Sequence, residues 1–234
     1  MTYVVSDLHG CSEKFERLLR KIRFTDDDVM YVLGDIVDYG EGSMDLLCDL
    51  SMRFNVIPIV GDHDLRAGKL LTVLDGMLRD GSMPSDPSVL AEMTAWIQDG
   101  GQHTMEGFKA LDDDMKEGVL EYLSDMSLYE EVEVRGKKYL LLHAGIADFD
   151  PATPIEDYMP EDLVHVALDP NVRYFDDVTV IAGHVPTYEI EGAERGKILC
   201  CRRLPRCRPS RKRSRKAGSR ALILRKWKRR RPML

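Results

Sequence analysis

The sequence predicts an α/β fold built around parallel strands, and three observations support this prediction. Short apolar runs alternate with segments whose apolar residues recur every three or four positions, which is the pattern of strands alternating with helices. Five of the runs end in a sharp turn that carries Asp or His. The runs are about five to seven residues long, as expected of buried strands, whereas a membrane helix needs roughly 20 apolar residues.

Three predicted strands and two predicted helices open the chain in the order βαβαβ. The strands are expected at 3–6, 29–33 and 56–60, and the helices at 11–22 and 44–52. Strands joined by helices in this way run parallel, so their carboxyl ends meet at one edge of the sheet. The polar turns that follow the three strands are therefore expected to lie side by side.

Residues 65–128 differ from the segments around them and predict a helical insertion. Three apolar stripes at helical spacing indicate three helices, and two prolines separate the first helix from the second. After the insertion, 130–134 and 137–142 are expected to form a hairpin, and 178–182 a further strand.

The formal net charge of −7 conceals a division of the chain. Sixteen of the 33 Lys and Arg residues lie after position 197, whereas all 40 Asp and Glu residues lie before it, so residues 1–197 carry −23 and residues 198–234 carry +16. We therefore predict a folded domain over 1–197 and a basic tail over 198–234, either disordered or produced by a shifted reading frame. Binding of nucleic acid is an open alternative for this tail and is expected at no other part of the chain.

The sequence indicates neither a membrane span nor a signal peptide. No apolar run is long enough to cross a bilayer. The N-terminus enters a predicted strand almost at once, which leaves no room for the charged and apolar regions of a signal peptide. We therefore expect a cytoplasmic protein without a membrane partner.

The polar turns supply the candidate metal ligands. Two divalent ions held close together need a carboxylate between them to screen their repulsion, and Asp35, on the central turn, is the expected bridge. Asp7 and His9 are expected to bind one ion with Asp35. Three further side chains are expected at the second ion: Asp62, His143 and His184. Mixed nitrogen and oxygen ligands favour Mn, with Fe or Zn as alternatives, and two such ions can activate water and clamp a phosphoryl group.

The same turns resemble the signature blocks of a known superfamily, the calcineurin-like metallophosphoesterases. The similar blocks occur in the same order and spacing: SDLHG (6–10), GDIVDYG (34–40), GDHD (61–64), HAG (143–145) and GHVPT (183–187). WIQDGGQHT (96–104) adds to the resemblance, which covers about residues 1–197. The chain resembles in particular the bacterial branch of the phosphoprotein phosphatases, with the symmetrical diadenosine tetraphosphatases as near relatives.

The resemblance implies a fold, an activity and roles for single residues. The fold is a four-layer α-β-β-α sandwich with a helical insertion, and the six ligands named above hold the two metals. The activity is hydrolysis of phosphomonoesters by a metal-bound hydroxide, with His63 as the general acid and Asp38 as its orienting partner. A serine/threonine protein phosphatase is the preferred interpretation. A diadenosine tetraphosphate-type hydrolase, acting on a small phosphoester, and a non-catalytic protein that binds metal, phosphate or RNA are the alternatives.

Three departures from the family pattern affect the predicted phosphate site. Tyr39 stands where the family has a phosphate-binding Arg, and Tyr donates one hydrogen bond without a positive charge. Asp62 stands where the family has an Asn ligand, which adds a negative charge at the second metal. The only Arg between the last two His ligands is Arg173, and Arg66 lies four residues after Asp62. Tyr39, Arg66 and Arg173 are therefore the candidate substrate-binding residues.

Overall fold

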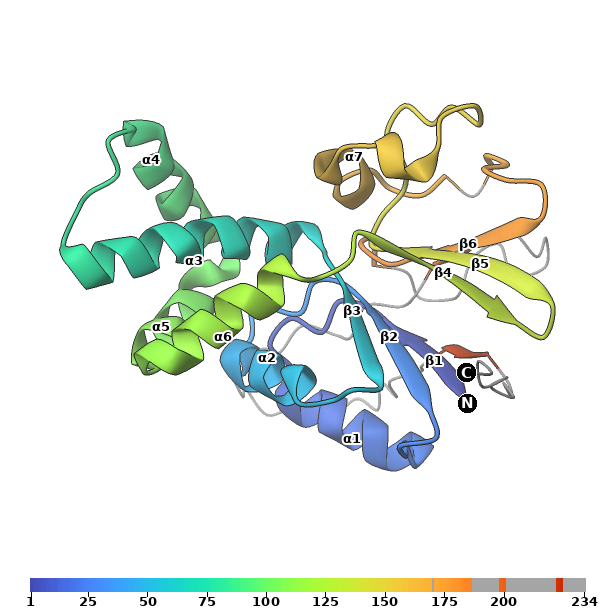
Figure 1. The fold of residues 1–234 in the computed structure, drawn as a ribbon, viewed down its shortest axis with the longest axis horizontal. Helices are drawn as coiled ribbons and strands as arrows, with labels where there is room; N and C mark the ends of the chain where they lie inside the picture. The colour runs from blue at the N-terminus through green and yellow to red at the C-terminus, as the bar shows by residue number, and fades with distance from the viewer. Residues whose placement is uncertain (170, 187–197, 201–221, 225–234) are drawn as a thin grey trace, which may run out of the picture.

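The described part of the chain folds into two four-stranded sheets accompanied by helices (Figure 1). The computed structural model describes residues 1–169, 171–186, 198–200 and 222–224. Within these residues, the predicted α/β class and the two-sheet architecture are confirmed.

The first sheet has the strand order β3-β2-β1-β8. Its strands are β1 (Thr2–Val5), β2 (Val29–Leu33), β3 (Val56–Ile59) and β8 (Leu222–Leu224). β1, β2 and β3 run parallel, whereas β8 is antiparallel to β1. Helices α1 (Ser12–Ile22) and α2 (Ser43–Ser51) connect the parallel strands, so the predicted βαβαβ order is confirmed.

The second sheet has the strand order β4-β5-β6-β7. Its strands are β4 (Tyr129–Val134), β5 (Lys137–Leu142), β6 (Val178–Ala182) and β7 (Ile198–Cys200). β4 and β5 form the predicted hairpin, while β6 is parallel to β5 and to β7. A single bridge between Ile59 and Ser127 continues the first sheet toward the second, where the chain leaves the helical insertion.

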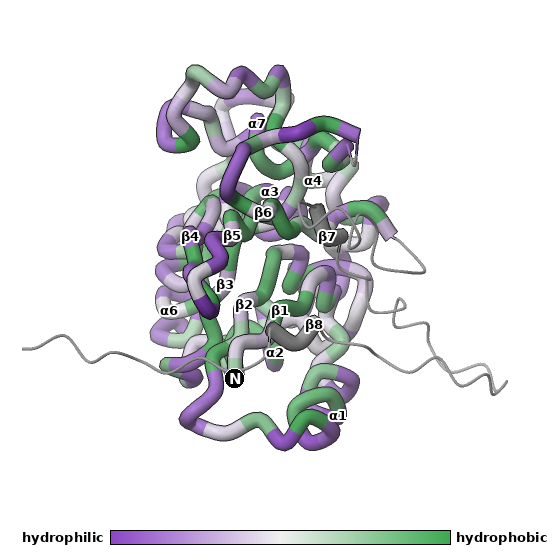
Figure 2. Tube along the Cα trace, turned by 90° about the vertical axis from the view of Figure 1, so that its right-hand side faces the viewer, coloured by the Kyte–Doolittle hydropathy of each residue, from purple (hydrophilic) through white to green (hydrophobic). Residues whose placement is uncertain are grey.

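Three apolar cores show how the layers are packed. Along β1, Tyr3 and Val5 join the core beneath the helices, whereas Val4 points to the opposite face and joins a core shared by the two sheets. Likewise Leu141 of β5 faces the first sheet, and its neighbours in sequence face a third core on the far side of the second sheet. Side chains alternate between the faces of a strand, so each sheet is buried on both sides. In Figure 2 the trace of β6 is mostly coloured hydrophobic, while α1 carries both colours.

The helical insertion contains four α-helices where the sequence predicted three. They are α3 (Asp62–Asp80), α4 (Pro87–Trp96), α5 (Gln102–Ala110) and α6 (Asp113–Ser124). A kinked segment, Ile97–Gly101, joins α4 to α5, and its Asp99 and Gly100 have non-helical backbone angles. Helix α5 buries only Thr104 and Phe108, so it lacks the apolar stripe that marks a helix in sequence. Helix α3 begins at Asp62, so its first turn carries residues of the candidate site.

Two short elements follow β5, and two described strands fall in the predicted tail. The elements are a 3₁₀ turn (Ile155–Asp157) and helix α7 (Pro160–Val164), which lies beside the second sheet (Figure 1). Strands β7 and β8 lie within 198–234. The rest of that range lies outside the described residues, so the disordered or frameshifted tail and its binding of nucleic acid stay predictions. No helix among the described residues is long and apolar enough to cross a membrane.

Candidate metal centre

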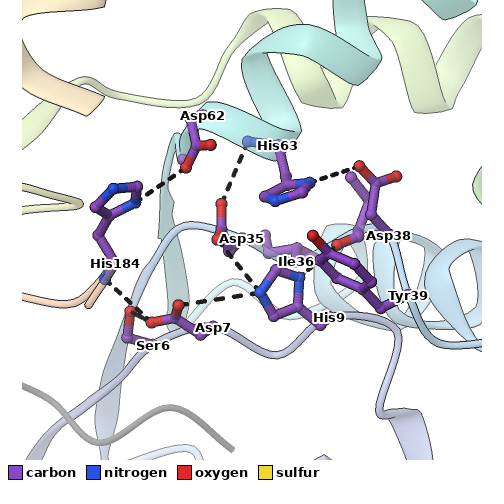
Figure 3. A network of polar contacts seen from close by, with 12 residues as sticks. Ser6, Asp7, His9, Asp35, Ile36, Asp38, Tyr39, Asp62, His63 and His184 are labelled. Carbon is purple, nitrogen blue, oxygen red and sulfur yellow. Dashed lines mark hydrogen bonds and ion pairs between the residues drawn. The ribbon is translucent and has the colours of Figure 1, made fainter. Parts of the chain in front are cut away.

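The candidate site lies where strands of both sheets end, and its side chains point toward one another (Figure 3). Asp7 and Asp35 follow β1 and β2 by two residues, and His184 follows β6 by two. His143 follows β5 directly, and Asp62 is the first residue of α3. The five turns that the sequence predicted to meet therefore lie together.

The first group of candidate metal ligands consists of Asp7, His9 and Asp35, whose donor atoms lie within 4.8 Å of one another. All three residues are buried. His9 Nε2 lies 3.3 Å from Asp35 Oδ2 and 4.0 Å from Asp7 Oδ1. His9 Nδ1 lies 3.0 Å from the carbonyl oxygen of Val37. A proton on Nδ1 that is donated to this carbonyl places the lone pair on Nε2, facing the two carboxylates, as metal ligation requires.

The second group consists of Asp35, Asp62, His143 and His184, again with donor atoms within 4.8 Å of one another. Asp62 Oδ1 lies 3.1 Å from His143 Nε2 and 3.2 Å from His184 Nδ1. His143 Nδ1 lies 2.7 Å from the carbonyl oxygen of Leu33, which turns Nε2 toward the carboxylates. Asp35 belongs to both groups, so the predicted bridging ligand is in the position that the role needs.

The electrostatics of the site fit bound cations. Burial raises the pKa of Asp35 to about 7, with the nearby Asp62 and Asp7 adding to the shift and His143 opposing it. Burial also opposes the ionised form of Asp62, but hydrogen bonds with His143 and His184 outweigh it and lower its pKa. Burial alone would lower the pKa of His143, yet the Asp35 charge and the bond to Asp62 raise it to about 10. Protonated His143 balances part of the negative charge of the crowded carboxylates, and divalent ions can supply that positive charge instead.

Unusual backbone geometry is concentrated at the site. Among the described residues, nine non-glycine residues have positive φ, and six of them lie in these turns: Asp7 (55°), His9 (44°), Asp35 (54°), Asp38 (70°), Tyr39 (62°) and His184 (64°). This left-handed region is costly for residues with a Cβ, although Asp and His tolerate it better than most. This backbone strain occurs at the positions where the polar side chains turn inward from the strand ends.

His63 and Asp38 form the predicted pair beside the metal ligands. His63 Nδ1 lies 2.7 Å from Asp38 Oδ2, and both residues are buried. Burial lowers the pKa of His63, but the hydrogen bond to Asp38 and the surrounding carboxylates raise it to about 9. At neutral pH His63 is therefore a protonated imidazole whose Nδ1–H is donated to Asp38.

The three candidate substrate-binding residues lie in two different places. The Tyr39 ring packs against His9 and His63, with centroid distances of 4.9 Å and 5.1 Å. Tyr39 Oη and Arg66 Nη1 each lie 3.3 Å from a carboxylate oxygen of Asp99, so these two residues meet beside the site. Arg173 instead lies in an exposed loop, where its Nη2 contacts Asp176 Oδ1 at 2.6 Å. Its role in binding substrate stays a prediction.

Sequence reasoning assigned no role to four side chains that hold the site residues in place. Ser6 Oγ donates to Asp7 Oδ2 at 2.6 Å. Asp64 accepts from the backbone N–H groups of Ile36, Val37 and Gly61, and so ties the turn after β2 to the start of α3. The other two, Trp96 and Thr104, contact Asp38 from the helical insertion. Ser6 and Asp64 lie inside the recognised motifs, whereas Trp96 and Thr104 bound the WIQDGGQHT stretch, which is the only signal that could have found them.

Comparison with protein-family models matches residues 2–214 to the model of the calcineurin-like phosphoesterases. The match begins in β1 and continues past residue 197, the predicted end of the domain. It includes all six candidate metal ligands and the pair of His63 and Asp38.

Two curated relatives are similar to part of this chain. A symmetrical bis(5'-nucleosyl)-tetraphosphatase from Acidovorax sp. (strain JS42) is 33% identical over 147 residues, which are 62% of this chain and 43% of the relative. The same enzyme from Salmonella paratyphi B is 38% identical over 81 residues, or 34% of this chain and 28% of the relative. The matched part thus spans less than half the length of these relatives.

Two structures share the fold at low identity. One, assigned as a candidate diadenosine tetraphosphatase, has a TM-score of 0.57 at 18% identity and covers 85% of this chain and 81% of its own. The other, a protein serine/threonine phosphatase from Saccharomyces cerevisiae, has a TM-score of 0.57 at 16% identity and covers 86% and 66%. At these identities the likeness concerns the fold alone.

Proposed function

This chain belongs to the calcineurin-like phosphoesterase family, and on that premise we propose that it hydrolyses phosphoesters with the help of two divalent metal ions. The observation that carries the proposal is that Asp35 is shared by two groups of buried ligands. Carboxylate and imidazole donors in this mixture suit manganese, with iron or zinc as alternatives.

Each residue of the site has a distinct task in the proposed reaction. Asp7 and His9 would hold one ion, and Asp62, His143 and His184 the other, with Asp35 between them. Two ions so placed supply Lewis acidity toward the phosphoryl group and activate a water molecule. His63 donates a proton to the leaving oxygen, while Asp38 fixes its tautomer and orientation. Tyr39 and Arg66 are proposed to contact the substrate on the His63 side of the site.

For the substrate, we favour a bis(5'-nucleosyl) polyphosphate over the phosphorylated protein that the sequence motifs suggested first. The curated relatives that match this chain are named symmetrical bis(5'-nucleosyl)-tetraphosphatases. The likeness to a serine/threonine phosphatase concerns the fold only. Symmetrical cleavage of a tetraphosphate releases a nucleoside diphosphate, whose negative charge suits a neighbouring cation such as Arg66.

The direct test is hydrolysis by the purified chain loaded with manganese. We expect bis(5'-adenosyl) tetraphosphate to give ADP as the sole nucleotide product by ion-exchange chromatography, at a higher kcat/KM than a phosphoserine peptide. Asp35→Asn serves as the inactive control. AMP and ATP as products would reject symmetrical cleavage, and a higher kcat/KM on the peptide would restore the protein phosphatase.

A non-catalytic metal- or phosphate-binding protein remains the alternative of a different class. It predicts that the chain retains manganese but hydrolyses neither the nucleotide nor the peptide nor an aryl phosphate. Metal content measured on the same preparation separates this outcome from a preparation that failed to load.

A further inference from the structure

We propose that Trp96 and Thr104, two residues of the helical insertion, are positioning residues that hold the Asp38 carboxylate against His63. They would act through Asp38, so that the imidazole faces the leaving group at a fixed angle. The proposal rests on the function proposed above. It gives the helical insertion a role in catalysis in addition to its role in packing the core.

The contacts around Asp38 satisfy both of its carboxylate oxygens. Asp38 Oδ2 accepts from His63 Nδ1 at 2.7 Å and from the indole Nε1 of Trp96 at 2.9 Å. Asp38 Oδ1 accepts from Thr104 Oγ1 at 2.7 Å. The Asp38 backbone N–H in turn donates to Thr104 Oγ1 at 3.0 Å, so this threonine hydroxyl bonds to both the side chain and the main chain of Asp38.

Burial makes the loss of these hydrogen bonds costly. Asp38, Trp96 and Thr104 are each fully buried, with 0% exposure. A buried indole N–H can only donate, and leaving it without an acceptor costs about 1–3 kcal/mol. A carboxylate with three donors at fixed positions cannot rotate away from His63 without breaking at least one of these bonds. The arrangement therefore restricts the orientation of the His63 ring as well as that of Asp38.

The kink in the segment Ile97–Gly101, where Asp99 and Gly100 have non-helical backbone angles, explains how two residues eight positions apart reach one carboxylate. Gly100 has φ of 108°, which residues with a side chain rarely adopt, and its carbonyl accepts from the Tyr39 backbone N–H at 2.9 Å. A Cβ at Gly101 would fall 2.3 Å from Cε2 of Trp96, so only glycine lets the backbone lie against the indole. The kink turns the chain so that α4 and α5 deliver Trp96 and Thr104 to the same side chain.

The proposed role affects one step of catalysis more than the others. A strongly basic leaving group, such as phenolate, needs a proton as the P–O bond breaks, whereas p-nitrophenolate departs readily without one. Loosening Asp38 should therefore slow the release of phenolate and leave the metal-dependent part of the reaction in place. General acid catalysis contributes about 100-fold to 10,000-fold, so imperfect positioning should remove a part of that factor.

The test compares phenyl phosphate and p-nitrophenyl phosphate in the manganese-loaded full-length chain. Thr104→Val removes the hydrogen bonds of the Thr104 hydroxyl with the Asp38 carboxylate and backbone N–H, and its contact with Ser43, while it keeps the shape of the side chain. Trp96→Phe removes the indole N–H bond to Asp38 and keeps an aromatic ring. We expect kcat on phenyl phosphate to fall about tenfold or more and kcat on p-nitrophenyl phosphate to change less than about twofold. Thr104→Ser keeps the hydroxyl and should restore the wild-type ratio. Thr94→Val is the matched control, because Thr94 lies in the same insertion and its Oγ1 donates to the Leu90 carbonyl, one turn earlier on α4 and away from Asp38.

A second measurement does not depend on turnover. In the zinc-loaded protein, which is diamagnetic, the Nδ1–H proton of His63 should give a downfield proton NMR signal, assigned by its loss in His63→Asn. We expect Thr104→Val and Trp96→Phe to shift or broaden this signal and Thr94→Val to leave it unchanged. Trp96→Phe provides an independent variant if Thr104→Val does not fold.

The outcomes separate the positioning role from the proposed function. If the wild-type chain hydrolyses both esters and the variants slow both equally, the positioning role is wrong and the function stands. If the wild-type chain hydrolyses neither of these esters, nor bis(5'-adenosyl) tetraphosphate, nor the phosphoserine peptide, the phosphoesterase proposal fails. The NMR signal then decides the positioning role, which is rejected if both variants leave the signal unchanged.

Discussion

Asp35 faces His9 with one carboxylate oxygen and His143 with the other: Oδ2 lies 3.3 Å from His9 Nε2, and Oδ1 lies 3.5 Å from His143 Nε2. Each oxygen thus belongs to a different group of ligands. A monodentate contact to each ion is what a bridging carboxylate makes.

Replacing this bridge should therefore affect both ions at once. We expect Asp35→Asn to lower the manganese content below two ions per chain and to reduce hydrolysis at least about 100-fold, because loss of even an outer partner of a metal site costs about 10-fold to 100-fold. Elemental analysis and the aryl phosphate rate provide the two readouts. Asp49→Asn is the control, since Asp49 of α2 pairs with Arg53, which lies just after that helix. Full metal content in Asp35→Asn would contradict the shared ligand.

His63 should be needed for the reaction but not for binding metal. The groups of candidate ligands exclude it, and its Nδ1 is occupied by Asp38. We expect His63→Asn to lower kcat on phenyl phosphate about 100-fold or more while manganese content stays that of the wild type. A loss of one ion per chain would instead identify His63 as a ligand and reassign the proton donor.

Asp62 and Tyr39 test whether departures from the family pattern weaken the site. Asp62 Oδ1 lies within 3.2 Å of nitrogens of His143 and His184. An Asn in its place keeps an oxygen that can bind a metal, and it removes a negative charge from the site that would receive the substrate phosphate. Tyr39→Arg adds a positive charge near His63. We expect each variant to raise kcat/KM on p-nitrophenyl phosphate, measured at saturating manganese. A fall in both would show that the two residues are adaptations of this chain to its own substrate.

The sequence predicted the site better than it predicted what holds the site together. Asp7 and Asp35 follow β1 and β2 by two residues, and the carboxyl ends of these neighbouring parallel strands meet at one edge of the sheet, so their convergence required no knowledge of packing. His184 follows β6 of the second sheet, so its place beside them depends on how the two sheets pack. Trp96 and Thr104 reach Asp38 because the chain kinks at Gly100, and the spacing of apolar residues in the sequence does not predict such a kink. Their roles could only be seen once the helices had been placed.

A residue's position between two sequence motifs predicted its location in the structure less well than its position just after a strand. Arg173 lies between His143 and His184 in sequence, but in the structure it pairs with Asp176, three residues further along an exposed loop. Strand β8 arises from the basic stretch after residue 197, where the local sequence gave no alternating pattern. It is the pairing with β1 that defines this strand, and such long-range pairing is absent from local sequence.

Asp99 should limit the access of substrate phosphate to Arg66. Its two carboxylate oxygens accept from Tyr39 Oη and Arg66 Nη1, each at 3.3 Å, and its side chain is 59% exposed. The leaving diphosphate of a dinucleotide competes with this carboxylate for the guanidinium. We expect Asp99→Asn to lower KM for bis(5'-adenosyl) tetraphosphate about two- to fivefold, the size of one exposed ion pair, with little change in kcat.

The control for Asp99 is the pair of Arg173 and Asp176. Asp176→Asn releases Arg173 in the same way, but on a loop where no contact with the site is seen among the described residues, and KM should stay that of the wild type. Arg66→Ala should raise KM for the dinucleotide more than KM for p-nitrophenyl phosphate, whose leaving group carries no phosphate. If Asp99→Asn and Asp176→Asn change KM equally, the effect comes from net charge, and Arg66 is not the group that binds the leaving diphosphate.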